Sequence, residues 1–254
     1  MDLTMSEHQA PQPKKRSRIK RSRRGLEERS RLGNLRVVVE VAFEMVRGFR
    51  RLHFLDPCVA VFGSARIAEG DPVYERTRKV ASRLAARGFS IVTGGGPGLM
   101  EAANRGAREA GGVSVGCTIQ LPHEERSNDF LDVHVDFEYF LTRKYMLLKY
   151  SYAFVVMPGG FGTVDELFEA LTLIQTEKIE RFPIVLMGQE YWEPLRMQLD
   201  RMLETGTISA KDRDLVLFTE DVEEAVRHIE ANAVARFDLE PHLEPSRLLG
   251  ERRP

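Results

Sequence analysis

Residues 158–166 read Pro-Gly-Gly-Phe-Gly-Thr-Val-Asp-Glu, a glycine turn followed by two carboxylates. The preceding run, Tyr152 to Met157, is continuously apolar like a buried parallel strand, and an amphipathic helical pattern follows the turn. Backbone N–H groups at a helix start lack intrahelical partners and carry the positive end of the helix dipole. A strand, a glycine loop and a helix in this order therefore predict a phosphate cradle, where we place the chemistry of the chain.

Asp165 and Glu166 are expected in the first turn of that helix. As plain first-turn acids they would each stabilise the helix by roughly 0.3–1 kcal/mol. A carboxylate beside a bound phosphate repels it, however, so catalysis gives the better reason for a carboxylate in this context. Neighbouring helix residues point about 100° apart, so the two cannot face each other as an acid–base pair. One of them must work with another group.

Two further glycine loops follow apolar runs. Gly63-Ser64 comes after Cys58–Phe62, and Gly94-Gly95-Gly96-Pro97-Gly98 comes after Phe89–Thr93. Three consecutive glycines lose much backbone entropy on folding, which favours a backbone approached closely by a ligand. Neither loop matches the dinucleotide pattern G-x-G-x-x-G or a P-loop, which disfavours NAD and ATP-hydrolysing chemistry.

Arg143-Lys144 lies on a helix predicted immediately before the strand that leads to the glycine turn. A surface basic pair is the alternative interpretation. A guanidinium near Glu166 would keep that acid ionised and could hold either phosphate or base. Phe161 is either a plug in the core or an aromatic that flanks a nucleobase. His134 has no metal-ligand spacing and is interpreted as structural or solvent-facing, and no metal site is predicted.

The alternation of strand-like and helix-like segments predicts the fold class. It runs from about Cys58 to Arg236, and 43% apolar residues in 254 are ample for a core. We expect one α/β domain with a doubly wound, Rossmann-like, mostly parallel sheet of about seven strands. An N-terminal helix over 26–52 precedes a core over 56–236. Strands are predicted at 58–62, 89–93, 113–121, 133–135, 152–157, 183–187 and 215–218, and the other helices at 72–87, 99–110, 139–151, after 158, at 192–205 and at 221–236.

The charge is unevenly distributed. Residues 14–24 hold eight cations and no acid, so a formal charge of −1 overall leaves −9 on the rest once these are removed. We expect a disordered basic tail over 1–25 that could touch nucleic acid, while the acidic body has no general attraction for it. A flexible tail is expected over 237–254. No signal peptide or membrane span is predicted, and Cys58 and Cys117 are expected to be buried thiols in a cytoplasmic protein.

Together these motifs resemble the LOG ("Lonely Guy") family of cytokinin riboside 5′-monophosphate phosphoribohydrolases, often mislabelled lysine decarboxylases. The likeness covers roughly residues 56–232 and rests on Gly63-Ser64, the run 94–104 (Gly-Gly-Gly-Pro-Gly-Leu-Met-Glu-Ala-Ala-Asn), Arg143-Lys144 and 158–166. The N-terminal extension is similar to that of the longer subgroup, which forms oligomers above the dimer. The resemblance implies hydrolysis of the N-glycosidic bond of an adenosine 5′-monophosphate, preferably N6-substituted, without metal or cofactor.

The resemblance also implies roles for individual residues. Arg143 and Glu166 match the catalytic pair. The implied substrate-binding residues are Gly63, Ser64, Gly95, Gly96, Lys144, Gly159, Gly160, Phe161, Gly162, Thr163, Val164, Asp165 and Thr172, with an acid in the loop after the third strand, either Glu124 or Glu125. Asp165 stands where many members have Glu. Because C–N cleavage builds positive charge on the sugar, a fixed carboxylate at 166 suits the reaction.

Two alternatives remain open, and a third is discounted. A general purine nucleoside 5′-monophosphate nucleosidase for salvage would use the same residues. A carrier of a phosphorylated pterin, such as molybdenum cofactor, would share the fold without catalysis, although it would not need a carboxylate beside its phosphate clamp. Lysine decarboxylation would require a lysine that binds pyridoxal phosphate, and Lys144 lacks the sequence context for it.

Overall fold

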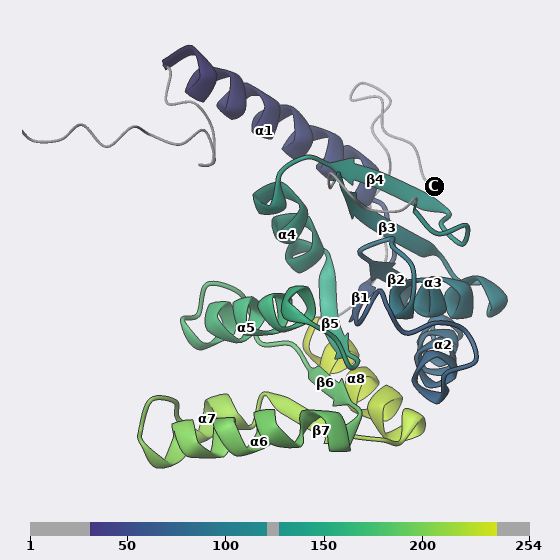
Figure 1. Ribbon diagram of the computed structural model, residues 1–254, viewed down its shortest axis with the longest axis vertical. Coiled ribbons are helices and arrows are strands. Elements are labelled where there is room, and N and C mark those ends of the chain that lie inside the picture. The colour runs from purple at the N-terminus through teal and green to yellow at the C-terminus, as the bar shows by residue number, and fades with distance from the viewer. Residues whose placement is uncertain (1–30, 121–126, 238–254) are drawn as a thin grey trace, which may run out of the picture. The chain divides into compact units, whose positions relative to one another are not determined.

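The computed structural model describes residues 31–120 and 127–237 (Figure 1). The chain divides after Glu40 into two compact units, and the fold below is that of the second, residues 41–254. The predicted basic tail over 1–25, the loop that contains Glu124 and Glu125, and the tail after 237 lie outside the described residues. None of the described helices combines the length and the apolar character needed to cross a bilayer.

Strands and helices alternate along the chain, as predicted. The strands are β1 (Cys58–Phe62), β2 (Ser90–Thr93), β3 (Ser114–Ile119), β4 (Val133–Phe137), β5 (Ser151–Val156), β6 (Ile184–Met187) and β7 (Val216–Thr219). The helices are α1 (Arg31–Leu52), α2 (Pro72–Ala85), α3 (Leu99–Glu109), α4 (Phe140–Lys149), α5 (Phe161–Gln175), α6 (Gln189–Glu204), α7 (Ala210–Arg213) and α8 (Val222–Phe237). The short helix α7 was not predicted, because four residues are too few to show a helical period.

The seven strands form one parallel sheet in the order β4-β3-β2-β1-β5-β6-β7. The chain builds outward from β1 to β4 in one direction and from β5 to β7 in the other. The order therefore reverses between β1 and β5, at the centre of the sheet. Such a reversal leaves a crevice beyond the carboxyl ends of the two strands, where α/β sheets bind ligands.

Helices cover both faces of the sheet, which confirms the doubly wound class. Leucines, valines and alanines of α2, α3 and α8 form one buried cluster with alternate strand residues. Side chains of α4, α5 and α6 form the other cluster, together with Leu52 of α1. Cys58 and Cys117 are free and buried within this second cluster, and burial raises the pKa of Cys117 to about 12. Both thiols are thus buried, as predicted.

Local signals set the ends of α2. Asp71 caps the helix, since its Oδ1 accepts a hydrogen bond from Val73 N at 2.8 Å, and Pro72 occupies the first helical position. Proline suits that position because its fixed φ is helical and its missing N–H would have had no partner. The chain turns at Gly88, whose φ of +91° is open mainly to glycine.

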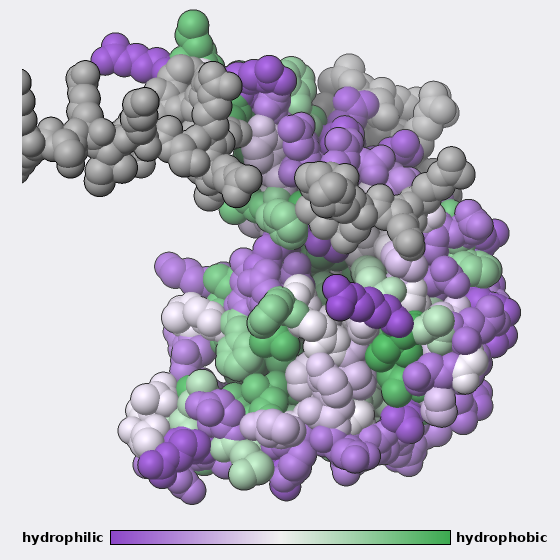
Figure 2. Space-filling view, viewed as in Figure 1, coloured by the Kyte–Doolittle hydropathy of each residue, from purple (hydrophilic) through white to green (hydrophobic). Residues whose placement is uncertain are grey.

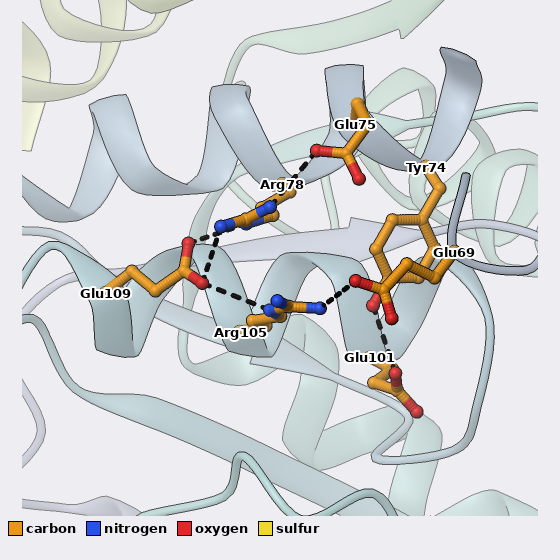
Figure 3. Close-up of polar contacts among 7 residues, drawn as sticks. All are labelled: Glu69, Tyr74, Glu75, Arg78, Glu101, Arg105 and Glu109. Carbon is orange, nitrogen blue, oxygen red and sulfur yellow. Dashed lines mark hydrogen bonds and ion pairs between the residues drawn. The ribbon is translucent and has the colours of Figure 1, made fainter. Parts of the chain in front are cut away.

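A network of ion pairs joins α2 to α3 (Figure 3). Arg78 of α2 donates to both carboxylate oxygens of Glu109, at 2.6 and 2.7 Å, and Arg105 donates to Glu109 at 3.1 Å. The helices approach closely here, because a side chain at Gly106 would collide with the carbonyl oxygen of Arg78. Tyr74, which is fully buried, donates its hydroxyl to Glu101 at 3.0 Å.

Helix α1 confirms the helix predicted before the core, over the part of 26–52 that the structure describes. Its buried residues are Glu44, Gly48 and Leu52, at four-residue spacing, whereas Val46 is 53% exposed. Phe49 packs edge-on against Tyr145 of α4, with ring centroids 6.2 Å apart. The sequence pattern predicted the helix, whereas packing determines that the face with Glu44, Gly48 and Leu52 is buried.

Candidate active site

The carboxyl ends of β1, β2 and β5 meet at a cleft of about 1330 Å³, large enough for a nucleotide. The loops after these strands, the start of α5 and the ends of β3 and β4 line it. Most of the predicted site residues lie together in its wall, namely Gly63, Ser64, Gly95, Gly96, Arg143, Gly159, Gly160, Phe161, Gly162, Thr163, Val164, Asp165 and Glu166.

Backbone hydrogen bonds fix the three glycine loops against one another. Ser64 N donates to Pro158 O at 3.0 Å, and Leu99 N donates to Ser64 O at 2.9 Å. Gly98 has a φ of +68°, and a Cβ there would lie 2.5 Å from the Ser64 carbonyl oxygen. The loops after β1, β2 and β5 therefore form one connected wall.

Helix α5 begins directly after Gly160, earlier than the sequence suggested. Val164 N already donates to Gly160 O at 3.1 Å, and no side chain of the described residues caps this helix. Asp165 and Glu166 consequently lie in the second turn, which corrects the prediction that placed them in the first. The amides at the helix start remain available to an anion, and the carboxylates stand one turn away from it.

Gly160 and Gly162 have no conformational reason to be glycine. The φ of Gly160 is −87°, and Gly162 is not among the glycines with positive φ. A Cβ at either would meet no atom of the described residues within 4 Å. Any side chain there would instead project into open space at the α5 N-terminus. These two glycines leave room for a ligand.

Glu166 is the carboxylate that burial isolates. Its side chain is 5% exposed, and its Oε2 has no hydrogen-bond partner among the residues that the structure describes. Burial raises its pKa to about 7, against the opposing charges of Lys144 and Arg143, while Glu169 and Asp165 add to the rise. The expectation that a nearby guanidinium would keep Glu166 ionised was therefore wrong. Removal of the carboxyl from water raises its pKa by more than the nearby cations lower it. A carboxyl that titrates near neutral pH suits proton transfer.

Arg143 lies across the glycine loop that follows β2. Its Nε donates to the Cys117 carbonyl at 2.8 Å, and a Cβ on Gly94 would collide with its guanidinium. Glycine at 94 thus makes room for the arginine. The guanidinium lines the cleft and acts on Glu166 through its charge.

Lys144 is engaged by acids of α5. Its Nζ lies 2.9 Å from Asp165 Oδ2 and 2.7 Å from Glu169 Oε2, and its side chain is 15% exposed. Lys144 and Asp165, both predicted to contact substrate, bind each other in this structure. Glu169 escaped the sequence analysis, although its spacing of four from Asp165 places both acids on one face of a helix.

A family model described as "Possible lysine decarboxylase" matches residues 100–229. A cytokinin riboside 5′-monophosphate phosphoribohydrolase of Mycobacterium tuberculosis is 31% identical over 175 residues, which are 68% of this chain and 92% of that protein. The chain belongs to this family, the LOG family. The resemblance drawn from the sequence motifs is confirmed. LOG3 of Arabidopsis thaliana, also named as such a phosphoribohydrolase, is 28% identical over 158 residues, 61% of this chain and 73% of that protein.

Solved structures show the same fold. The molybdenum cofactor carrier protein of Chlamydomonas reinhardtii is 26% identical, with a TM-score of 0.51, and the match covers 71% of this chain and 99% of that one. This LOG-family chain and a molybdenum cofactor carrier protein thus share a fold, so the fold alone does not decide between their functions.

One residue that the LOG resemblance suggested, Thr172, is not among those that line the cleft. Thr172 is exposed on α5 and donates its hydroxyl to Phe168 O at 2.7 Å. It stands six residues after Glu166, so it points about 240° around the helix from that carboxylate. Glu124 lies outside the described residues. Phe161, at 98% exposure, is no plug in the core, which removes one of its two interpretations.

A polar cluster in the wall of the cleft was not predicted from the sequence. His134 Nε2 lies 3.0 Å from Asp136 Oδ1 and 2.9 Å from Thr118 Oγ1, and all three residues line the cleft. Alternation along β4 puts His134 and Asp136 on one face, and this period-2 signal was readable in Val-His-Val-Asp-Phe. The sequence did not show that β4 pairs with β3, which brings Thr118 to His134 and Asp136.

Proposed function

We propose that this protein hydrolyses the N-glycosidic bond of adenosine 5′-monophosphates, N6-modified ones in preference, to give free base and ribose 5-phosphate. The observation that carries the proposal is Glu166, a buried carboxyl whose Oε2 has no hydrogen-bond partner among the described residues, one turn from an α5 start that no described side chain caps. The names of the relatives in M. tuberculosis and A. thaliana support it.

From the lining of the cleft we infer where each part of the nucleotide binds. The amides at the start of α5 and the space beside Gly160 and Gly162 take the 5′-phosphate. Placed there, the phosphate brings the ribose toward Glu166 in the next turn. The base then extends toward Arg143 and the wall formed by Thr118 and His134.

Glu166 acts in its ionised form. It stabilises the positive charge that develops on the sugar and accepts a proton from water, while the water oxygen bonds to C1′ and the C1′–N9 bond breaks. The electron pair leaves with the purine, which takes a proton from solvent. Arg143 orients the carboxylate and favours departure of the base through its charge. The phosphate clamp supplies the positioning energy.

The direct test is base release. Purified protein is mixed with AMP, GMP or N6-isopentenyladenosine monophosphate, and free base is measured by chromatography. We expect release from at least one nucleotide, far slower release from unphosphorylated adenosine, and loss of release with retained nucleotide binding in Glu166→Gln. Unchanged turnover in Glu166→Gln would remove this residue from the mechanism.

The same assay separates the two rival functions. Equal release from AMP, GMP and the N6-modified nucleotide would favour a general purine nucleosidase for salvage. The structural similarity to the C. reinhardtii carrier favours a second candidate, binding of a phosphorylated pterin. No release from any of the three nucleotides, with tight retention of the pterin, would support that carrier function instead.

We infer a homo-oligomer from the exposed apolar surface. Phe43 of α1, Phe140 and Leu141 of α4, and Phe161 of α5 are each more than half exposed, and Figure 2 shows hydrophobic surface over α4 and α5. Patches of this kind mark association sites. Light scattering on the protein as it elutes from a size-exclusion column distinguishes a dimer from a hexamer. A monomer would contradict the inference.

Two further proposals concern location and the basic tail. We infer a cytoplasmic location, supported by two buried free thiols, and cell fractionation tests it. The basic run at 14–24 is proposed as the part of the chain that could contact nucleic acid, whereas the acidic body would not. Binding of a short duplex by the full chain, lost on deletion of residues 1–25, is the expected result.

A further inference from the structure

Helix α4, which carries Arg143, begins without a cap of its own. Its N-cap residue is Tyr139, whose side chain makes no capping hydrogen bond, and its first turn contains no acid. The first N–H groups of a helix have no intrahelical acceptors, so another part of the chain must satisfy them when they are buried.

Glu44 of α1 supplies acceptors at the N-cap residue of α4 and at the residue before it. Its Oε1 accepts a hydrogen bond from Glu138 N at 2.6 Å, and its Oε2 accepts from Tyr139 N at 3.4 Å. The hydroxyl of Thr142, in the first turn of α4, lies 2.5 Å from the same Oε2. One carboxylate thus lies within hydrogen-bond distance of two backbone N–H groups and of the Thr142 hydroxyl, whose single proton has Tyr139 O at 2.8 Å as a second acceptor. The carboxylate lies at the positive end of the α4 dipole, although α4 is more than 90 residues further along the chain.

Close packing holds this carboxylate in place. Glu44 is 8% exposed and begins the buried stripe that continues through Gly48 and Leu52. A Cβ at Gly48 would lie 2.8 Å from the Met146 methyl group, so α1 and α4 are in intimate contact there. Burial of a carboxylate costs free energy unless the charge is paired or accepts hydrogen bonds. The hydrogen bonds of Glu44 go to the segment that begins α4, and Arg47 of α1 lies 3.9 Å from its Oε1.

The residue that follows Thr142 is Arg143, and Lys144 comes next. Arg143 lies against the Cys117 carbonyl and Lys144 against Asp165 and Glu169, so a small shift of α4 moves both cations relative to α5. We propose that Glu44 is a positioning residue of the reaction, which fixes the start of α4 and so holds Arg143 and Lys144 beside Glu166. This inference rests on the proposed function.

The kinetic test compares Glu44→Ala, Glu44→Gln and Leu52→Ala. Leu52 is a matched control, since it is 1% exposed on the same stripe but lies away from the start of α4. We expect Glu44→Ala to lower kcat roughly 10- to 100-fold, with the KM for AMP within about threefold because the α5 clamp is untouched. Glu44→Gln keeps an acceptor for Glu138 N without the charge, and its kcat should be intermediate. Leu52→Ala should lose stability but keep kcat below its melting temperature.

The pH profile gives a readout that loss of stability alone would not move. The groups that act on Glu166 are the cations Lys144 and Arg143 of α4 and the acids Asp165 and Glu169 of α5. If α4 shifts and takes its cations away, the pKa of Glu166 rises. The acid limb of kcat should therefore move up by about half a pH unit or more in Glu44→Ala, by less in Glu44→Gln, and not in Leu52→Ala.

Hydrogen exchange tests the cap without reference to catalysis. Glu44→Ala should speed amide exchange at residues 138–142, whereas Leu52→Ala should not. The inference is overturned if folded Glu44→Ala keeps its kcat within about twofold and its acid limb unmoved. Should Glu44→Ala not fold, wild-type kcat and an unmoved limb in Glu44→Gln overturn it equally. If the wild type itself releases no base, the proposed function fails, and the exchange result alone then decides whether Glu44 caps α4.

Discussion

Two opposing influences set the charge of Glu166, and burial outweighs the cations. Removal from water favours the neutral acid, while Lys144 and Arg143 favour the carboxylate. The resulting pKa of about 7 leaves the residue divided between its two forms at neutral pH. A carboxyl of this kind can both lose and regain a proton in one catalytic cycle.

The rate of base release should therefore rise with pH through about 7, as Glu166 loses its proton. Lys144→Ala removes the cation that lowers this pKa most, so the midpoint should move to higher pH. Lys149→Ala, an exposed lysine at the end of the same helix, serves as the control and should leave the midpoint in place. A pH–kcat/KM profile measures both, and a midpoint unaffected by Lys144→Ala would contradict this account of Glu166.

Gly162→Ala should separate folding from binding. Nothing lies within 4 Å of the added methyl group, and alanine suits a helix better than glycine. The free energy of unfolding should stay equal or rise by up to about 1 kcal/mol. The methyl group would occupy the space assigned to the phosphate, so we expect the KM for AMP to rise at least about tenfold.

Denaturant titration and steady-state kinetics check both effects of Gly162→Ala. Gly111→Ala is the reverse control. Position 111 also faces open space, but its φ of +75° strains alanine, so that variant should lose stability and keep its KM. A normal KM in Gly162→Ala would show that the ligand does not use this space.

At the scale of elements, ion pairs between α2 and α3 tie together the helices that follow β1 and β2. Glu109→Gln breaks the contacts with Arg78 and Arg105 at once. Since these side chains are part-exposed, we expect a loss of about 1 kcal/mol in the free energy of unfolding, smaller in 1 M salt. Urea denaturation measures this loss.

The effect of Glu109 also has a defined pH range. Arg78 above all lowers the pKa of Glu109, so its stabilisation is present above the unfolded pKa near 4.5 and disappears as the pH falls through the lower, folded value. Glu204→Gln is the control, because it disturbs only an exposed pair with Arg201. If Glu109→Gln and Glu204→Gln lose equal free energy of unfolding, the α2–α3 network does not stabilise the fold more than a single exposed ion pair does.

For the molecule as a whole, Glu166 is a source of instability. Because its folded pKa of about 7 exceeds the unfolded value near 4.5, ionisation is penalised in the folded state. The penalty is absent below pH 4.5, grows as the pH rises and is complete above about 7, where it reaches about 3 kcal/mol. Glu166→Gln should therefore raise the melting temperature at pH 8 but not at pH 4. Calorimetry that shows the same increment at both pH values would contradict the raised pKa.

Local patterns predicted the elements of this molecule well. Apolar runs between glycine loops predicted the strands, and Pro72 and Gly88 bracketed α2. The same alternation predicted a mostly parallel sheet, which the structure confirms, and the glycine loops lie together beyond the carboxyl ends of its strands. Apolar runs and helix-end residues can be read from the sequence because they act between residues that are close together in the chain.

Contacts between distant segments were not predictable in this way. The cap that Glu44 places on α4 joins residues 94 to 98 positions apart, and no periodicity reports it. The ion pairs of Lys144 depend on how α4 meets α5, and the His134 cluster depends on strand pairing. The site's backbone was therefore predictable, whereas the partners of its charged side chains required the fold.

The interlocked glycine loops have a practical consequence for redesign. Main-chain hydrogen bonds, such as that from Ser64 N to Pro158 O, hold the glycine loops in place, whereas the side chains of Thr118, Gln120 and His134 line the cleft without belonging to these loops. Libraries aimed at new leaving groups belong at those three positions. Diversity introduced there leaves untouched the scaffold by which every variant would grip its substrate.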